Sequence, residues 1–344
     1  MLDTARTIAG TVFAAALAVT IAAGAAGAVE PEKKEITIGY GSMSGGFGGW
    51  WIAKDKGFFE EQGFDHVELL YTRTTTGLQM LNGGQIDALG TGCAEFFEAT
   101  EAGFPNKVVG NLFDYNLYLI ASRPAIKKPA DLVGQTLAVN RLGDTGHLSA
   151  RYALRRAGVD PDSVSYVQIG STPERFSALD SGAVAAAVQA GALRPMVDAA
   201  HLNVLIDLQD PDVPNCLGGI AVSEEFAQKY PKTVEAMLRA MVKGNAYLSA
   251  GPAAETRQIF GDYMKLPADD DRVISSWEYF SGPAHSRKPM MTEKSARNVL
   301  AMMAEGDPKW ADKDPAPYLD LSFMQKLDQE GYLDKVYDDI KAAR

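Results

Sequence analysis

Short segments of alternating hydrophobic and polar residues predict strands, and segments with helical spacing follow them. Residues 35–40, Glu-Ile-Thr-Ile-Gly-Tyr, alternate as a half-buried strand does. A glycine-rich turn then leads into an apolar segment over 50–59, which predicts a helix that stops near Gly57. Further strands are predicted over 67–71 and 86–90, each followed by a helical segment. Because strands that alternate with helices usually pair in parallel, this order predicts an α/β sheet.

The same order recurs in the next part of the chain. Strands are predicted over 135–139, 164–168 and 184–188, again separated by helical segments. The segments 81–88 and 179–186 also resemble each other, since each contains a helix end, a glycine-containing turn and a buried strand. Two copies of one β-α-β-α-β unit predict two similar lobes.

The character of the chain changes after residue 222, where helical patterns begin to dominate. Ser223 opens a capped helix. Helices are then predicted over the ranges 233–248, 253–263, 269–280, 292–306 and 322–343. We interpret these helices as packing and surface elements.

The first 28 residues form a secretory signal pattern rather than part of the fold. Arg6 supplies a positive charge, and an apolar stretch over 8–26 follows it. Small residues at 26–28 fit a signal peptidase site, so the mature chain is expected to begin near Val29. The alternative is a membrane anchor, but the stretch is rich in Ala and Gly and only weakly hydrophobic. The pattern predicts an exported protein in the periplasm.

Net charge and cysteine content indicate which partners and which covalent bonds to expect. The formal net charge is −11, and cleavage of the signal, which removes Asp3 and Arg6, leaves it unchanged. An acidic protein repels the phosphates of nucleic acids, so no nucleic-acid partner is expected. The two cysteines, Cys93 and Cys216, allow one bridge in an oxidising compartment. Sequence leaves open whether they pair or remain two separate thiols.

Motifs of common enzyme sites are missing from the sequence. The glycines over 39–49 do not have G-x-G-x-x-G spacing, and the run 41–45, Gly-Ser-Met-Ser-Gly, misses a nucleophile elbow by one position. The four histidines are far apart, and no pair has metal-ligand spacing. Because no nucleophile, base and orienting group assemble, we expect a protein that is not an enzyme and needs no cofactor or metal.

Three turns follow strand ends and precede helices, at 42–47, 91–93 and 143–147. Open α/β sheets bind ligands at this edge. Small hydroxyl residues there offer hydrogen bonds, and Met43 and Phe47 offer apolar walls. The expected ligand-binding residues are Ser42, Met43, Ser44, Phe47, Thr91, Gly92, Cys93, Thr145, Gly146 and His147.

Several of these stretches together resemble a known family. Residues 36–40, 53–60, 84–92, 128–139 and 153–161 resemble the NMT1/THI5-like substrate-binding proteins of ABC importers for sulfonates, taurine, nitrate and thiamine precursors. The resemblance covers about residues 35–222. It implies a bilobal Venus-flytrap fold of two α/β lobes joined by a two-crossing hinge, which closes around a ligand.

The resemblance also implies a division of the chain. After the signal at 1–28, lobe 1 would comprise 29–120 and 217–344, and lobe 2 would comprise 121–216. The family often carries a Trp-Glu-Pro-like run after the last strand of lobe 2. Here Gln189–Pro195 stands in that place, which adds Gln189 and Arg194 to the expected pocket wall. The Cys-rich motif of the eukaryotic thiamine-precursor enzymes is absent from the sequence.

Taken together, these features predict a monomeric periplasmic receptor that delivers a small organic solute to an ABC importer. A sulfonate, carboxylate or similar anion is the expected ligand, because helix N-termini favour negative charge. Arg73, Arg141 and Arg194 are candidate partners of such an anion. If none of them faces the cleft, a neutral aromatic or heterocyclic solute, such as a thiamine precursor, is the better prediction. An exported enzyme on the same scaffold and a ligand-binding protein for a membrane sensor are the alternatives.

Overall fold

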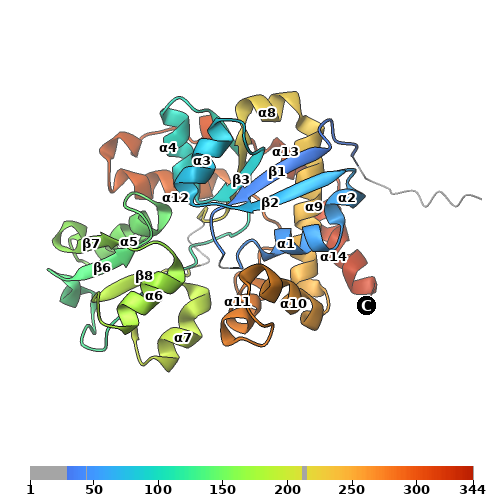
Figure 1. The fold of residues 1–344 in the computed structure, drawn as a ribbon. Coiled ribbons are helices and arrows are strands. Elements are labelled where there is room, and N and C mark those ends of the chain that lie inside the picture. The colour runs from blue at the N-terminus through green and yellow to red at the C-terminus, as the bar shows by residue number, and fades with distance from the viewer. Residues whose placement is uncertain (1–28, 44, 211–214, 344) are drawn as a thin grey trace, which may run out of the picture.

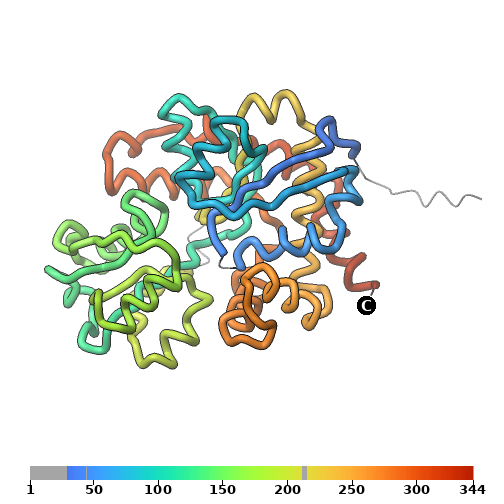
Figure 2. The backbone as a smooth tube through the Cα atoms, viewed as in Figure 1, coloured from blue at the N-terminus to red at the C-terminus, as the bar shows by residue number. Residues whose placement is uncertain are grey.

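Two α/β lobes lie side by side in the computed structural model of this protein (Figure 1). The structure describes residues 29–43, 45–210 and 215–343. The predicted signal peptide and Ser44 therefore lie outside the described residues. Each lobe is built on one five-stranded sheet, and the backbone trace passes from the first lobe into the second and back (Figure 2). The predicted bilobal α/β fold is confirmed.

The first sheet has the strand order β2-β1-β3-β10-β4. Its strands are β1 (Glu35–Tyr40), β2 (His66–Tyr71), β3 (Ala88–Thr91), β4 (Asn106–Asn111) and β10 (Gly219–Ser223). Strand β1 pairs in parallel with β2 and β3, as the alternation of strands and helices predicts. Strand β10 returns from the other lobe and inserts antiparallel between β3 and β4. The sheet is therefore mixed rather than wholly parallel.

The second sheet repeats this plan with the order β7-β6-β8-β5-β9. Its strands are β5 (Tyr118–Ser122), β6 (Thr136–Val139), β7 (Ser165–Gln168), β8 (Ala186–Ala190) and β9 (Asn203–Asp207). Strand β6 pairs in parallel with β7 and β8, and β5 pairs antiparallel with β8 and β9. Because β5 lies wholly in this sheet, the expected border after residue 120 cuts through a strand. We propose that the second lobe begins before Tyr118.

Helices cover both sheets, and most of the predicted helical segments are present. The helices of the first two thirds of the chain are α1 (Gly48–Asp55), α2 (Phe58–Glu61), α3 (Thr74–Asn82), α4 (Cys93–Glu101), α5 (Thr145–Arg156), α6 (Thr172–Asp180), α7 (Arg194–Ala199) and α8 (Glu224–Lys229). Helix α1 ends at the predicted place, because Gly57 adopts a left-handed φ of 70° that disfavours other residues. The remaining helices are α9 (Pro231–Ala250), α10 (Ala253–Met264), α11 (Asp271–Ser281), α12 (Glu293–Ala304), α13 (Ser322–Gln329) and α14 (Tyr332–Ala342).

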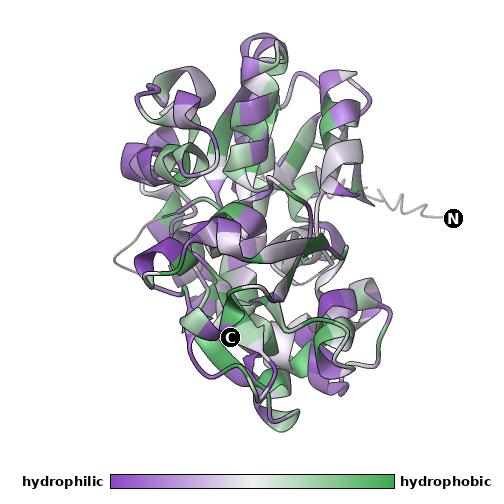
Figure 3. Ribbon diagram, turned by 90° about the vertical axis from the view of Figure 1, so that its left-hand side faces the viewer, coloured by the Kyte–Doolittle hydropathy of each residue, from purple (hydrophilic) through white to green (hydrophobic). Residues whose placement is uncertain are grey.

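The core of the first lobe forms where α1 crosses α9. Trp50 and Trp51 on α1 are fully buried. Glycine allows the two helices to approach closely, since a Cβ atom on Gly49 would lie 2.9 Å from the Cα of Asn245. The outer surfaces of the helices carry most of the hydrophilic residues (Figure 3). Helix α9 thus packs against α1, and we propose that the C-terminal helices belong to the first lobe.

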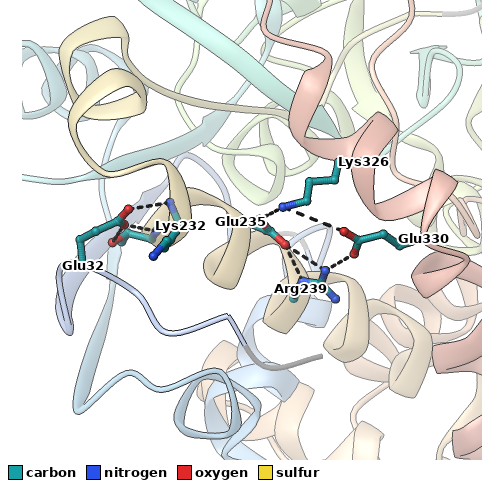
Figure 4. Close-up of polar contacts among 7 residues, drawn as sticks. Glu32, Lys232, Glu235, Arg239, Lys326 and Glu330 are labelled. Carbon is teal, nitrogen blue, oxygen red and sulfur yellow. Dashed lines mark hydrogen bonds and ion pairs between the residues drawn. The ribbon is translucent and has the colours of Figure 1, made fainter. Parts of the chain in front are cut away.

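An ion-pair network around the buried pair of Arg239 and Glu235 holds the C-terminal helices together (Figure 4). Arg239 on α9 donates to Glu235 Oε1 at 2.9 Å and also pairs with Glu330, which follows α13. Lys326 binds the second oxygen of Glu235 at 2.7 Å. At the start of the same helix, Glu32 accepts hydrogen bonds from two backbone N–H groups of the first turn of α9. This carboxylate fixes the start of the folded chain to the helix N-terminus.

The two cysteines form a disulfide. Cys93 is the first residue of α4, and Cys216 lies in the segment that returns to β10. Their Cα atoms are 5.5 Å apart, and both residues are fully buried. The bond therefore joins a turn at the edge of the first sheet to one of the two crossings between the lobes.

Candidate functional site

The turns that follow β3 and β6 meet between the lobes. A Cβ atom on Gly92 would overlap the hydroxyl of Thr145 and would lie 2.6 Å from Glu95 Oε2. Thr145 is the first residue of α5, and Glu95 lies in the first turn of α4. The sequence predicts that these two turns face each other across a cleft, and the structure brings them together.

Glu95 is the main residue of this contact that sequence analysis missed. Its side chain is 4% exposed, and Oε2 accepts a hydrogen bond from Thr145 Oγ1 at 2.8 Å. Burial, and next the negative charge of Asp144, raise the pKa of Glu95 to about 7. A glutamate in the first turn of a helix ordinarily serves only to complement the helix dipole, so the sequence carries no sign of this role.

Asp144 occupies the N-terminus of the facing helix. Its carboxylate accepts hydrogen bonds from the backbone N–H groups of His147 at 2.8 Å and Arg141 at 3.1 Å. The amide of Asn140 donates to the same carboxylate at 2.8 Å. Asp144 therefore caps α5 and satisfies one of its free N–H groups, that of His147. Its charge faces Glu95 across the junction of the lobes.

The predicted residues of the first turn lie at the end of β1. Met43 Sδ accepts from Tyr40 Oη at 3.6 Å, and Ser42 is partly exposed beside it. Phe47 is buried, with its ring centroid 4.8 Å from that of Trp50, so it belongs to the core of the first lobe. Nothing can be said of Ser44, which lies outside the described residues.

The other predicted residues of these turns have varied surroundings. Thr91 lies 3.3 Å from the hydroxyl of Thr74. Cys93 is joined to Cys216, so it offers no free thiol to a ligand. Gly146 packs beside Tyr118, with which its Cβ position would make ordinary contact at 3.7 Å.

His147 contacts its own lobe. Its Nδ1 accepts from the backbone N–H of Gly143 at 2.9 Å, and its ring lies edge-on to Tyr166. Burial, and next the charge of Arg151, lower the pKa of His147, so the ring is neutral at pH 7.

A second contact between the lobes lies near the end of β8. Tyr279 on α11 donates a hydrogen bond to Gln209, and a Cβ atom on Gly191 would overlap the same tyrosine hydroxyl. Gln189 lies two residues before Gly191. It is fully buried, and neither its amide nitrogen nor its amide oxygen has a hydrogen-bond partner among the described residues. A buried amide without partners is costly, so this side chain is a candidate for contact with a ligand.

The three candidate arginines have other partners or lie in solvent. Arg194 is exposed and pairs with Asp207 at 3.4 Å and Asp198 at 3.5 Å. Arg73 is exposed, and Arg141 lies 3.9 Å from Glu98. These arrangements do not support an anion held by an arginine of the cleft.

The described ranges also contain no group of three His, Cys, Asp or Glu residues placed to hold a metal ion. Across those same ranges, no helix combines the length and apolar character needed to cross a membrane.

Solved structures with a similar fold include periplasmic binding proteins. A structure from Bordetella bronchiseptica RB50 has a TM-score of 0.76 and 20% identity, covering 88% of this chain and 99% of that one. The periplasmic aliphatic sulphonate binding protein SsuA from Escherichia coli has a TM-score of 0.65 and 20% identity, covering 82% of this chain and 94% of that one. These likenesses define the fold as that of the periplasmic binding proteins.

A family model gives the narrower assignment. The NMT1/THI5 like model matches residues 45–255, more than half of the chain, and the chain belongs to this family. Among curated proteins, the chain is 25% identical over 240 residues to the Saccharomyces cerevisiae 4-amino-5-hydroxymethyl-2-methylpyrimidine phosphate synthase THI12. That match covers 63% of this chain and 68% of the yeast enzyme.

Proposed function

We propose that this protein is a periplasmic solute-binding receptor that delivers a small organic solute to an ABC importer. The observation that carries the proposal is Gln189, a fully buried amide without a partner among the described residues, at the edge where the lobes meet. A solute held between the lobes would supply the missing hydrogen bonds. The fold, shared with sulphonate-binding proteins of import systems, supports the same function.

The two contacts between the lobes suit a receptor that closes on its ligand. The contact of Glu95 with Thr145 and that of Tyr279 with Gln209 each join one lobe to the other. Both are small polar contacts, which a hinge motion breaks and reforms at low cost. The membrane subunits of an importer would then distinguish the closed receptor from the open one.

A binding experiment on the processed protein tests this function. Protein beginning at Val29 is screened by thermal shift against small organic solutes. Solutes that stabilise it are then measured by calorimetric titration. A ligand at one hundred times its Kd raises the stability by about 2.7 kcal/mol. Each hit is recovered and analysed for chemical change. A ligand released unaltered supports a receptor, whereas turnover would favour the synthase activity for which the yeast relatives are named.

The location and partner require separate measurements. N-terminal sequencing of the protein from a periplasmic extract should give Val29 or a residue near it. Reconstituted transport by the permease and ATPase of an ABC importer should depend on this protein. If a membrane sensor responds instead and no transport occurs, the receptor serves signalling.

A further inference from the structure

Two helix N-termini meet between the lobes, at α4 and α5, and each is filled by a carboxylate of the chain itself. Asp144 accepts the backbone N–H of His147 at the start of α5. Glu95 accepts its own backbone N–H in the first turn of α4, together with the hydroxyl of Thr145. A free helix N-terminus attracts an anion, because its N–H groups lack partners and carry partial positive charge. Here the backbone N–H groups of His147 and Glu95 already have carboxylate partners.

Charges of both signs surround this contact. The carboxyl groups of Glu95, Glu98 and Asp144 lie near the guanidinium of Arg141, and Lys309 also acts on Glu98. Arg175 is buried nearby. Its guanidinium donates hydrogen bonds to backbone carbonyls, including those of Val188 at 2.7 Å and Gly170 at 2.6 Å. An anionic ligand that reached Glu95 would lie beside the carboxyl groups of Glu95 and Asp144, which disfavours its binding there.

A separate observation at the same edge points to a ligand with polar groups. Gln189, the residue before the last of β8, has a fully buried amide with no partner among the described residues. It lies two residues before the contact of Gly191 with Tyr279 on the first lobe. An amide oxygen accepts hydrogen bonds, as the carboxyl group of Glu95 does. The amide of Gln189 also offers two N–H donors, so it fits a ligand that both donates and accepts, and the carboxyl group of Glu95 adds the preference for a donor.

We propose that the cleft selects a neutral or cationic solute rich in N–H donors, such as an amidine, a guanidine or a heteroaromatic amine, and that Glu95 determines this selectivity. The proposal rests on the proposed function, because it requires a ligand between the lobes. A donor that reaches Glu95 replaces or shares the hydrogen bond from Thr145. A sulfonate or carboxylate instead places a second negative charge against a buried carboxyl group, which is costly.

The test is a thermal-shift screen of the processed protein against three sets of solutes. One set holds anions such as ethanesulfonate, nitrate and succinate. The second holds neutral heteroaromatic amines such as 2-aminopyridine and cytosine, and the third holds amidines and guanidines such as benzamidine and methylguanidine. We expect stabilisation only by members of the second and third sets. Stabilisation by an anion would overturn the proposal and leave the receptor function standing, whereas no stabilisation by any set would count against both.

Substitution of Glu95 then tests its role with whichever solute binds. Glu95→Gln keeps the shape of the side chain, and we expect at least a tenfold loss of affinity for the donor solute. Glu101→Gln, on the far end of α4 where Glu101 pairs with Lys313 and Tyr318, should change affinity less than twofold. Circular dichroism and melting curves establish that each variant is folded. A Glu95→Gln variant that is folded and binds as tightly as the parent would remove Glu95 from the site.

Discussion

The carboxylate of Glu95 and the hydroxyl of Thr145 form a buried hydrogen bond of 2.8 Å between residues that are 50 positions apart in the chain. Glu95 belongs to the first lobe and Thr145 to the second, so the bond spans the junction where a ligand would enter. It places an ionisable group at the contact between the lobes.

The first prediction concerns pH. Because folding raises the pKa of Glu95 from 4.5 to about 7, the folded protein holds a proton that the unfolded chain releases. This contribution to stability is fully present below pH 4.5 and is lost as pH rises towards 7, a loss on the order of 1–3 kcal/mol. Glu95→Gln cannot lose that proton. At each pH, the melting temperature of Glu95→Gln is subtracted from that of the parent. This difference should decrease as pH rises from 5 to 7 and should stay level above pH 7.

A difference that stays constant across this range would show that Glu95 titrates as in water. Thr145→Val serves as a second probe. Removing its hydroxyl takes away a hydrogen bond that lowers the pKa of Glu95, so the window of pH dependence should move upward.

The second prediction concerns Gly92. Its φ is −65°, so the backbone conformation does not require glycine. What requires glycine is space, because a Cβ atom would overlap Thr145 and approach Glu95. Gly92→Val should hold the lobes apart and weaken ligand binding by about 1–3 kcal/mol, the scale of leaving buried polar groups unpaired.

The matched control for Gly92 is Gly306→Ala. Gly306 also lies near the second lobe, but a Cβ atom there would make only ordinary contact with Leu148 at 3.5 Å. Small-angle scattering without ligand should show the Gly92→Val variant more open than the parent, and the control unchanged. Equal affinities of the two folded variants would contradict the steric explanation.

The third prediction concerns Gln189. Replacement by Leu, which has a similar volume, removes an amide whose nitrogen and oxygen lack partners among the described residues. The protein without ligand should become more stable, by about 1 kcal/mol, because a buried unpaired polar group is lost. Ligand affinity should fall at least tenfold, or about 1.4 kcal/mol. Melting curves and titration together separate the two effects, with exposed Gln79→Leu as the control. A loss of stability without loss of affinity would show a structural role only.

The fourth prediction concerns Arg239. Its side chain is 5% exposed, and that of its partner Glu235 is 6% exposed. Arg239→Met leaves Glu235 with only the partly exposed Lys326 as a cationic partner, and we expect a loss of about 3–5 kcal/mol in the free energy of unfolding. Arg297→Met, which removes an exposed ion pair with Glu293 on α12, should cost under about 1 kcal/mol. Urea unfolding curves measure the free energy of unfolding of both variants. Equal losses would show that burial does not increase the contribution of the Arg239–Glu235 pair to stability.

The disulfide gives a fifth prediction. Cys93 and Cys216 are 123 positions apart, so their bond closes a long loop of the unfolded chain. The double variant Cys93→Ser, Cys216→Ser should lose about 2–4 kcal/mol of stability. The parent and the double variant are each unfolded and refolded with and without dithiothreitol. The reductant should lower the melting temperature of the parent and leave that of the double variant unchanged. A reductant effect of equal size on both proteins would argue against the bond.

Local sequence determined the elements and their order. Alternation over residues 35–40, the helix stop at Gly57 and the turns after β3 and β6 all depend on neighbours within a few positions, and the structure contains each of them. The family also follows from such local stretches. The periodicity of hydrophobic residues indicates which face of a helix or strand is buried. For this reason the α/β class could be predicted from the sequence.

Tertiary structure alone decided which distant residues meet. Strand β10 enters the first sheet after the chain has built the second, and its antiparallel pairing depends on two partners far away in sequence. The pairing of the two cysteines was open for the same reason. Glu95 looks like any glutamate in a first helical turn until α5 buries it beside Asp144. Burial and charge at a junction depend on the approach of two lobes, and no local pattern encodes that approach.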